Sequence, residues 1–219
     1  MRKKAVIFDL DGTLVDTLDS LEISVNRTMD RLGYRHVTKE QCREFIGNGA
    51  RVLVEKSLKS VTNGVDDELI KKATEIYQEE FSTYCTYQVK PYIGIVEMLM
   101  QLKTIGYTLA VLTNKPHAQA IVAVEELLGE EIFDVIQGQK DGLPRKPEAE
   151  SLWGVIRELG LSKDECVFVG DSEVDIQTGK NAQVYTIGVA WGFRNEDILM
   201  SEKADIIVHT ALEIIKVVD

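Results

Sequence analysis

Residues 5–16 read AVIFDLDGTLVD, and this stretch decides the topology and the chemistry that the rest of the chain has to support. The apolar run Ala5 to Phe8 predicts a buried strand that ends directly in Asp9. Side chains at i and i+2 of an extended chain point the same way, so Asp9 and Asp11 are expected to face one site, with Gly12 permitting a sharp turn. Two clustered carboxylates repel unless a cation is bound or one is protonated. The pattern therefore favours a hard divalent metal, first of all Mg²⁺, and chemistry on an anion.

Two other interpretations of this stretch have to be weighed. An acidic strand end is common before a helix, because Asp caps helices and complements their N-terminal dipole. A calcium loop of the EF-hand type requires Gly at its sixth position and Glu at its twelfth, where this chain has Leu14 and Ser20. The calcium loop is therefore excluded, and the rest of the chain must decide between a helix cap and a metal site.

The composition limits the class of protein and the kind of partner. With 219 residues, of which 44% are apolar, the chain can bury the core of one substantial α/β domain and carry an additional element. The net charge of -11 argues against nucleic acid or an anionic membrane as partner, because this surface as a whole would not attract either polyanion. An anionic small molecule would therefore need a locally positive pocket.

The cysteines and the N-terminus favour a cytoplasmic location. Cys42, Cys85 and Cys166 are an odd, scattered set without CxxC spacing, which is typical of unpaired thiols in a reducing compartment. The basic start MRKK is followed by only four apolar residues, which predicts a strand and no targeting peptide. Since no apolar run approaches the roughly 20 residues that span a bilayer, we expect a soluble protein without a membrane partner.

Short apolar runs alternate with helical patterns along most of the chain. Such alternation indicates a parallel sheet covered on both faces, and the predicted fold class is therefore α/β, a doubly wound, Rossmann-like parallel sheet. Ligands of such sheets bind beyond the carboxyl ends of the strands, where Asp9 and Asp11 point. The predicted strands are Ala5 to Phe8, Thr108 to Leu112, Asp134 to Ile136, Cys166 to Val169, Tyr185 to Val189 and Asp205 to Val208, and the helices are Ile93 to Ile105, Ala118 to Leu128, Ala149 to Leu159, Ile176 to Ala182 and Leu212 to Val217.

One stretch breaks this alternation. From Asp16 to about Gln88 no strand pattern is convincing, and the helical patterns predict an inserted domain of residues 17–88, between a first core segment of residues 1–16 and the remaining core of residues 89–219. An insertion that hangs on two connections can close over a site as a cap. The helices expected in it are Leu18 to Leu32, Lys39 to Phe45, Ala50 to Leu58 and Asp67 to Tyr84.

Polar residues follow the other predicted core strands where each strand ends. Each group alone is typical of a surface loop or a helix cap, whereas all of them at successive strand ends predict one site for an anion and a metal ion. A hydroxyl, an amide and two ammonium groups can contact phosphate oxygens, and two further carboxylates can support a cation. These residues are Thr113, Asn114 and Lys115 after the second strand, Lys146 after the third, and Asp171 and Asp175 with the preceding Gly170 after the fourth.

In their order, these segments resemble the four motifs of haloacid dehalogenase (HAD) superfamily phosphatases, in the branch whose helical cap is inserted after the first motif. The resemblance covers essentially the whole chain. It implies a phosphatase that works through an aspartyl-phosphate, with Mg²⁺ as cofactor and a small anionic phosphate ester as substrate. One departure concerns the third motif, which near relatives often continue as Lys-Pro-x-Pro. Here Lys146-Pro147 runs into Glu148-Ala149.

The resemblance also implies a role for each motif residue. Asp9 would be the nucleophile that attacks phosphorus, and Asp11 would protonate the departing alkoxide and later deprotonate the attacking water. Lys146 would neutralise the phosphoryl group and orient Asp9. The metal would be held by Asp9, Asp171 and the backbone carbonyl of Asp11, with Asp175 helping through water or by supporting the ligands, and the substrate phosphoryl group would be held by Thr113, Asn114 and Lys115.

Substrate choice is expected to come from the inserted domain. Its segment FIGNGARVLVE, residues 45–55, resembles the corresponding cap segment of phosphoglycolate phosphatases. The run Gly47-Asn48-Gly49 would let the backbone approach a small ligand, and Arg51 could pair with the carboxylate of that ligand. The alternative is that Arg51 is a solvated helix residue that faces Glu55, four positions on.

Other functions remain open at this point. Within the superfamily, Asp11 and Thr13 favour a phosphatase, but a pyrophosphatase or a sugar-phosphate phosphatase or mutase is not excluded. A phospho-aspartate switch of the receiver type also combines a doubly wound sheet with clustered acids, a Thr and a Lys. Receivers resemble this chain only loosely, since they lack a long helical insertion. A monomer and a homodimer are both compatible with the sequence.

Overall fold

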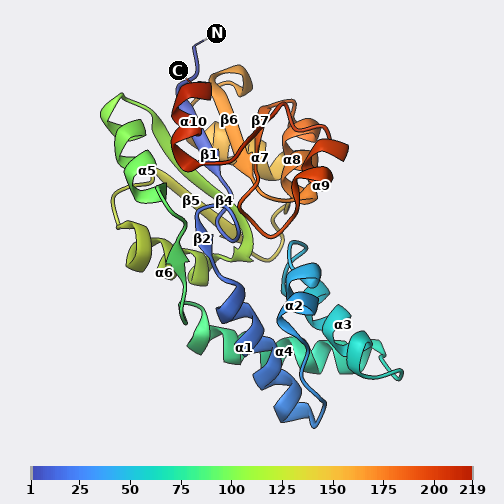
Figure 1. The fold of residues 1–219 in the computed structure, drawn as a ribbon. Helices are drawn as coiled ribbons and strands as arrows, with labels where there is room; N and C mark the ends of the chain where they lie inside the picture. The colour runs from blue at the N-terminus through green and yellow to red at the C-terminus, as the bar shows by residue number, and fades with distance from the viewer. Residues whose placement is uncertain (1, 219) are drawn as a thin grey trace. The chain divides into compact units, whose positions relative to one another are not determined.

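The computed structural model describes residues 2–218 and divides them between two compact units (Figure 1). One unit combines the N-terminal segment up to Asp16 with the chain from Lys90 onward, and the other is the continuous segment Thr17–Val89. The first unit is α/β and the second is helical. In the described part of the chain, no helix is both long and apolar enough to cross a membrane.

The α/β unit is built on a six-stranded sheet with the order β5-β4-β1-β6-β7-β8. The first strand, β1, pairs in parallel with β4 on one side and β6 on the other, and all four of its side chains are fully buried. A strand that is covered on both faces reads as an unbroken apolar run, which is why AVIF shows no alternation. The strands are β1 (Ala5–Phe8), β4 (Thr108–Pro116), β5 (Val135–Gln139), β6 (Cys166–Gly170), β7 (Tyr185–Val189) and β8 (Ile206–Val208).

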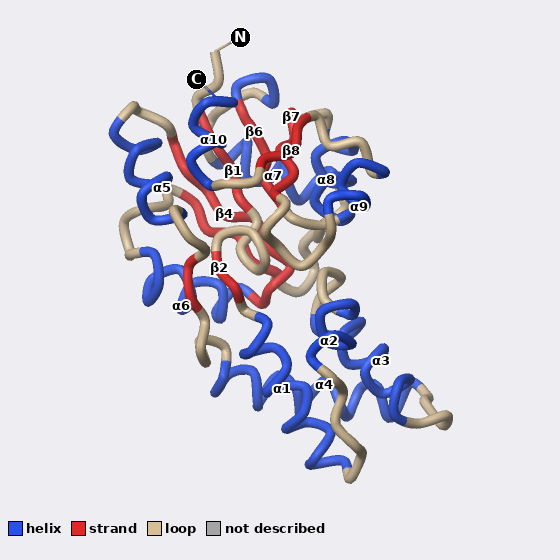
Figure 2. The backbone as a smooth tube through the Cα atoms, viewed as in Figure 1, coloured by secondary structure: helices blue, strands red, loops and turns tan. Residues whose placement is uncertain are grey.

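Helices cover both faces of this sheet, so the predicted doubly wound fold is confirmed (Figure 2). Ala5 and Ile7 pack in one apolar cluster with Leu152 and Val155 of α7, while α5 and α10 lie side by side on the opposite face. The helices are α5 (Ile95–Thr104), α6 (His117–Leu128), α7 (Ala149–Glu158), α8 (Glu173–Ala182), α9 (Glu196–Ser201) and α10 (Ala211–Val218), with a 3₁₀ turn at Lys163–Glu165.

The structure differs from the sequence-based prediction in several short segments. Strands β2 (Val15–Asp16) and β3 (Lys90–Pro91) form a two-stranded antiparallel ribbon, which is too short to show any periodicity. The helix α9 was not predicted. Strand β4 continues to Pro116, beyond its predicted end at Leu112, and α6 begins directly after it at His117.

The helical unit consists of four helices that pack around their own core. In α4, Tyr77 and Phe81 are 2% exposed and stack with ring centroids 5.4 Å apart. Gly47 and Gly49 both have positive φ, and Gly49 is the N-cap of α3. The helices are α1 (Leu18–Leu32), α2 (Lys39–Phe45), α3 (Ala50–Val61) and α4 (Asp67–Tyr84).

Candidate active site

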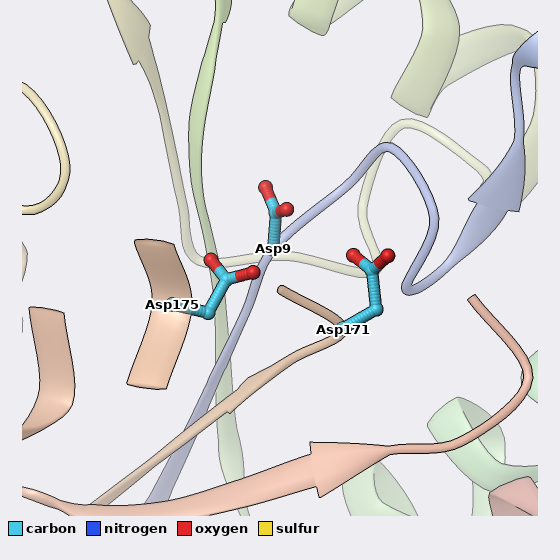
Figure 3. Close-up of side chains that lie close together, drawn as sticks. All are labelled: Asp9, Asp171 and Asp175. Carbon is cyan, nitrogen blue, oxygen red and sulfur yellow. The ribbon is translucent and has the colours of Figure 1, made fainter. Parts of the chain in front are cut away.

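Three buried aspartates gather at the carboxyl end of the sheet (Figure 3). Asp9 follows β1, Asp171 follows the neighbouring strand β6, and Asp175 lies in the first turn of α8. One carboxylate oxygen from each lies within 4.8 Å of the others. Parallel neighbours end at the same edge of a sheet, and this brings together residues that are more than 160 positions apart in the sequence. Clustered carboxylate oxygens are the donors that Mg²⁺ prefers.

Lys146 supplies positive charge to this cluster. Its Nζ lies 2.7 Å from Oδ1 of Asp9 and 2.7 Å from Oδ1 of Asp175, and its side chain is 3% exposed. One ammonium group faces three buried carboxylates, so the cluster keeps an excess of negative charge. A divalent cation would compensate that excess, which is an observation of this structure in favour of a metal ion.

The pKa values of these groups reflect the excess of negative charge. Burial raises the pKa of Asp9, the charge of Lys146 opposes this rise and the nearby carboxylate of Asp175 adds to it, so that the pKa of Asp9 lies at about 7. Burial, together with the charges of Asp175 and Asp9, also raises the pKa of Asp171 well above its usual value. Although burial alone would lower the pKa of Lys146, the charges of Asp175 and Asp9 raise it. Lys146 is therefore a permanent cation of the site.

Asp171 is fixed by groups from two loops. Thr13 Oγ1 donates to its Oδ1 at 3.1 Å, and the backbone N–H of Phe193 donates to its Oδ2 at 2.7 Å. Two glycines leave room for this carboxylate: a Cβ on Gly12 would lie 2.5 Å from Asp171 Oδ2, and a Cβ on Gly192 would lie 2.3 Å from Asp171 Cβ. The two loops form a close cradle around Asp171.

We predict that Gly192→Ala weakens binding of a divalent cation about ten- to a hundred-fold, because the added methyl group displaces Asp171. Titration calorimetry with Mg²⁺ measures this effect. Gly64→Ala is the matched control, since a Cβ there meets no heavy atom within 4 Å. Equal affinities of the Gly192→Ala variant and the control would show that the cradle does not shape a cation site.

Asp175 is held by the start of α8. The backbone N–H and the Oγ of Ser172 donate to its Oδ2 at 3.1 and 2.6 Å, while its Oδ1 accepts from Lys146. Gly170 permits this arrangement, because a Cβ there would lie 2.3 Å from the Asp175 side chain. Since both oxygens of Asp175 accept hydrogen bonds, its main effect is to hold Lys146 in place.

The residues after Leu112 face two different partners. The side-chain amide of Asn114 forms two hydrogen bonds with the backbone of Lys146. Its Nδ2 donates to the carbonyl oxygen of Lys146 and its Oδ1 accepts from the N–H of Lys146, both at 3.0 Å. Lys115 Nζ lies 2.9 Å from Oδ1 of Asp11. Asn114 and Lys115 were expected to contact the phosphoryl group of a substrate. In the structure, their side chains contact Lys146 and Asp11. Thr113 is 4% exposed, and its Oγ1 accepts the backbone N–H of Lys115 at 3.2 Å.

The predicted ligand-binding residues of the helical unit precede α3 or lie in its first turn. Gly47, Asn48 and Gly49 form the partly buried turn before this helix. The guanidinium of Arg51 lies 3.0 Å from Oδ1 of Asp67, whereas Glu55, the partner considered from the sequence, pairs with Lys59 at 2.5 Å. Because the Arg51–Asp67 pair is exposed, it contributes little and leaves Arg51 free to change partner.

Sequence reasoning missed the contribution of the loop after β7. Trp191 Nε1 donates to the carbonyl oxygen of Thr13 at 3.0 Å, and its neighbours Gly192 and Phe193 contact Asp171. Loop contacts made through backbone atoms leave no periodic signal. The only available signals were the hydroxyl of Thr13 within the first motif and the dipeptide Trp191-Gly192 after a strand.

The sequence is similar to known hydrolases over most of its length. The model of the family described as haloacid dehalogenase-like hydrolase matches residues 6–189. A phosphoglycolate phosphatase of Colwellia psychrerythraea is 32% identical over 201 residues, which cover 90% of this chain and 88% of the relative. A phosphoglycolate phosphatase of Agrobacterium fabrum is 34% identical over 203 residues, which cover 92% of this chain and 86% of the relative.

Solved structures show the same fold over the full length. A protein from Lactobacillus delbrueckii subsp. bulgaricus superimposes with a TM-score of 0.93 at 32% identity, covering 100% of this chain and 99% of that one. A protein from Haemophilus somnus, described as a predicted phosphoglycolate phosphatase, gives a TM-score of 0.92 at 26% identity with the same coverage.

Proposed function

Because the chain belongs to the haloacid dehalogenase-like hydrolase family, we propose that it is a Mg²⁺-dependent phosphatase that hydrolyses a small phosphate monoester through an aspartyl-phosphate, with phosphoglycolate as the preferred substrate. The observation that carries this proposal is the buried pair of Asp9 and Lys146, only 2.7 Å apart beside two further aspartates. A carboxylate that is oriented by a fixed cation is suited to attack phosphorus. The three cysteines are buried thiols, which supports a location in the cytoplasm.

The proposed reaction has two transfers. In the first, an oxygen of Asp9 attacks phosphorus, the bond from phosphorus to the leaving alkoxide breaks, and Asp11 donates its proton to that alkoxide. In the second, Asp11 takes a proton from water while the water oxygen attacks phosphorus and Asp9 is released. Lys146, which lies 2.7 Å from Asp9, and the buried Thr113 bind the phosphoryl oxygens.

Mg²⁺ fits the carboxylate donors, with Asp9 and Asp171 as side-chain ligands, the backbone carbonyl of Asp11 as a third and Asp175 in support. When bound, the ion neutralises charge on the phosphoryl oxygens. We expect Ca²⁺, which prefers more ligands at longer distances than Mg²⁺, to inhibit the reaction.

Other members of the same chemical class remain as alternatives. Pyrophosphate and sugar phosphates would need the same phosphoryl site, and a mutase would return the phosphoryl group to an alcohol in place of water. A receiver-type switch is excluded, because the family is one of enzymes. A screen of small phosphate esters and pyrophosphate with Mg²⁺ tests the proposal. Fastest turnover of phosphoglycolate would support it, and hydrolysis of no phosphate ester would overturn it.

Metal binding is expected to stabilise the protein more at high pH than at low pH. Since folding raises the pKa of Asp9 and Asp171, the metal-free folded state binds more protons than the unfolded state, and these groups reduce stability as the pH rises from about 4 to about 7. Mg²⁺ binds the deprotonated carboxylates and restores that stability, by about 2.7 kcal/mol at 100 times its Kd. Thermal unfolding with and without Mg²⁺ at about pH 5 and about pH 8 measures the difference, with Asp171→Asn as control. Equal increases in Tm at the two pH values would contradict this expectation.

Specificity is proposed to reside in the helical unit, acting as a cap. Arg51→Ala should lower kcat/KM for phosphoglycolate about ten- to a hundred-fold, because a charge-assisted hydrogen bond to the substrate carboxylate is lost. Turnover of p-nitrophenyl phosphate, which has no carboxylate, should stay nearly unchanged. Lys59→Ala, also on the exposed side of α3, is the control. Equal losses on both substrates would assign Arg51 a general structural role.

A further inference from the structure

We infer that Lys115 is a positioning residue that holds the carboxylate of Asp11 for proton transfer, and that it does not bind the substrate. This inference rests on the proposed phosphatase function and adds a residue to it. Its basis is the ion pair between Lys115 Nζ and Asp11 Oδ1, at 2.9 Å. The side chain of Lys115 is 1% exposed and that of Asp11 is 15% exposed.

The geometry of β4 explains why Lys115 points at Asp11. Asn114 and Lys115 lie in the last part of β4, where the register with β5 shifts, and their side chains contact different partners. Asn114 is anchored there by its two hydrogen bonds to the backbone of Lys146. Strand β4 lies beside β1, whose following turn carries Asp11. Lys115, which follows the anchored Asn114, therefore lies within reach of Asp11.

Burial of the Lys115–Asp11 ion pair explains how Lys115 restrains the carboxylate of Asp11. An ammonium group removed from water is stable only when it is paired and hydrogen-bonded, and the carboxylate of Asp11 gives Lys115 such a partner. The pair thereby restrains a carboxylate that lies in a turn. The contact with Lys115 is made by Oδ1 of Asp11. Oδ2 is the oxygen that is left to carry the proton.

In the proposed reaction, Oδ2 of Asp11 gives up a proton in the first transfer and takes one up in the second. In the first transfer, the proton on Asp11 Oδ2 moves to the alkoxide oxygen as the bond from phosphorus to that oxygen breaks and the bond to Asp9 forms. In the second, the proton of the attacking water moves to Oδ2 as the bond from phosphorus to Asp9 breaks. Lys115 keeps its protons throughout. Its effect is to hold Oδ1, so that Oδ2 stays near the oxygen that gains or loses a proton.

The test compares two substrates that differ in their need for a proton. The leaving group of phosphoglycolate requires protonation, whereas p-nitrophenolate leaves without it. Two variants change Lys115: Lys115→Met removes its charge and Lys115→Arg keeps it. The other two are Asp11→Asn and the double variant Asp11→Asn/Lys115→Met. Lys140→Met, at an exposed lysine of the same unit, is the control.

Lys115→Met is expected to lower kcat for phosphoglycolate about ten- to a hundred-fold with KM changed less than about two-fold, because proton transfer is impaired and binding is not. With p-nitrophenyl phosphate, the first turnover should keep its rate and the following turnovers should slow, which gives a burst of product. Lys115→Arg should recover most of the loss. In the Asp11→Asn background, Lys115→Met should change kcat less than about two-fold, because the group that Lys115 positions is already impaired.

Three results would overturn the inference while the proposed function stands. A rise in KM for both substrates at unchanged kcat would make Lys115 a substrate ligand. Multiplicative losses in the double variant would show that it acts independently of Asp11. Equal slowing of the first and later turnovers would make it a structural residue. If Lys115→Met fails to fold in thermal unfolding, Lys115→Gln replaces it in the same cycle. A wild-type protein that hydrolyses no phosphate ester would instead overturn the proposed function and this inference together.

Discussion

Asp9→Asn is expected to lose activity by on the order of 10⁴-fold or more, because the amide cannot form the acyl phosphate on which both transfers depend. The substitution keeps the size of a side chain that is 7% exposed, so the fold should be preserved. It also removes a carboxylate whose pKa burial raises, which relieves repulsion in the metal-free protein. Steady-state kinetics with p-nitrophenyl phosphate and a thermal unfolding curve measure the two effects.

Asp11→Asn provides the matched comparison for this prediction. Asp11 lies in the same turn, and it also carries a carboxylate, but its proposed role is proton transfer. This variant should therefore retain the first transfer from an activated donor and lose the second. Activity of Asp9→Asn near the wild-type level, or equal behaviour of the two variants, would contradict the assignment of different roles to these aspartates.

Lys146→Met should lose both activity and stability. Removal of the ammonium group leaves Asp9 and Asp175 as buried carboxylates without their cation, and breaking a buried pair in this way costs about 3–5 kcal/mol. We expect a decrease of this size in the free energy of unfolding of the metal-free protein, measured in urea at neutral pH. Activity should fall by about 10³-fold, since positioning and charge compensation dominate phosphoryl transfer.

The loss of stability in Lys146→Met should shrink at about pH 4, where protonation of Asp9, whose pKa is raised by burial, reduces the uncompensated charge. Lys140→Met removes an exposed charge of the same unit and controls for net charge. A Lys146→Met variant as stable as this control at neutral pH would show that the ammonium group does not hold the cluster together.

Much of the fold could be predicted from the sequence, because buried parallel strands and the helices between them have distinct periods. The run Ala5 to Phe8 is apolar without alternation since both of its faces are covered, and it is the strand that the sheet places between β4 and β6. The two-residue strands β2 and β3 could not be predicted in this way, since two residues define no period. The family and the class of enzyme that the motifs predicted are confirmed.

The site could be predicted only to the level of which strand ends meet. That Asp9 and Asp171 lie together follows from adjacent parallel strands. The direction of each side chain does not follow, because it depends on contacts made far away in the sequence. Asn114 contacts the backbone of Lys146 and Lys115 contacts Asp11, in a part of β4 where the register with β5 shifts. The cradle of Gly192 and Phe193 around Asp171 is built from backbone atoms and carries no side-chain signature.

The most direct test of the central claim is to identify the residue that becomes phosphorylated. The Asp11→Asn variant is mixed with p-nitrophenyl phosphate and Mg²⁺, quenched in acid during the first turnovers, and mapped by peptide mass spectrometry, beside the wild type and Asp9→Asn. We predict one phosphoryl group on Asp9, accumulated in Asp11→Asn because the second transfer lacks its base, and none in Asp9→Asn. Phosphate release without any labelled aspartate, or a label on a residue other than Asp9, would contradict the account.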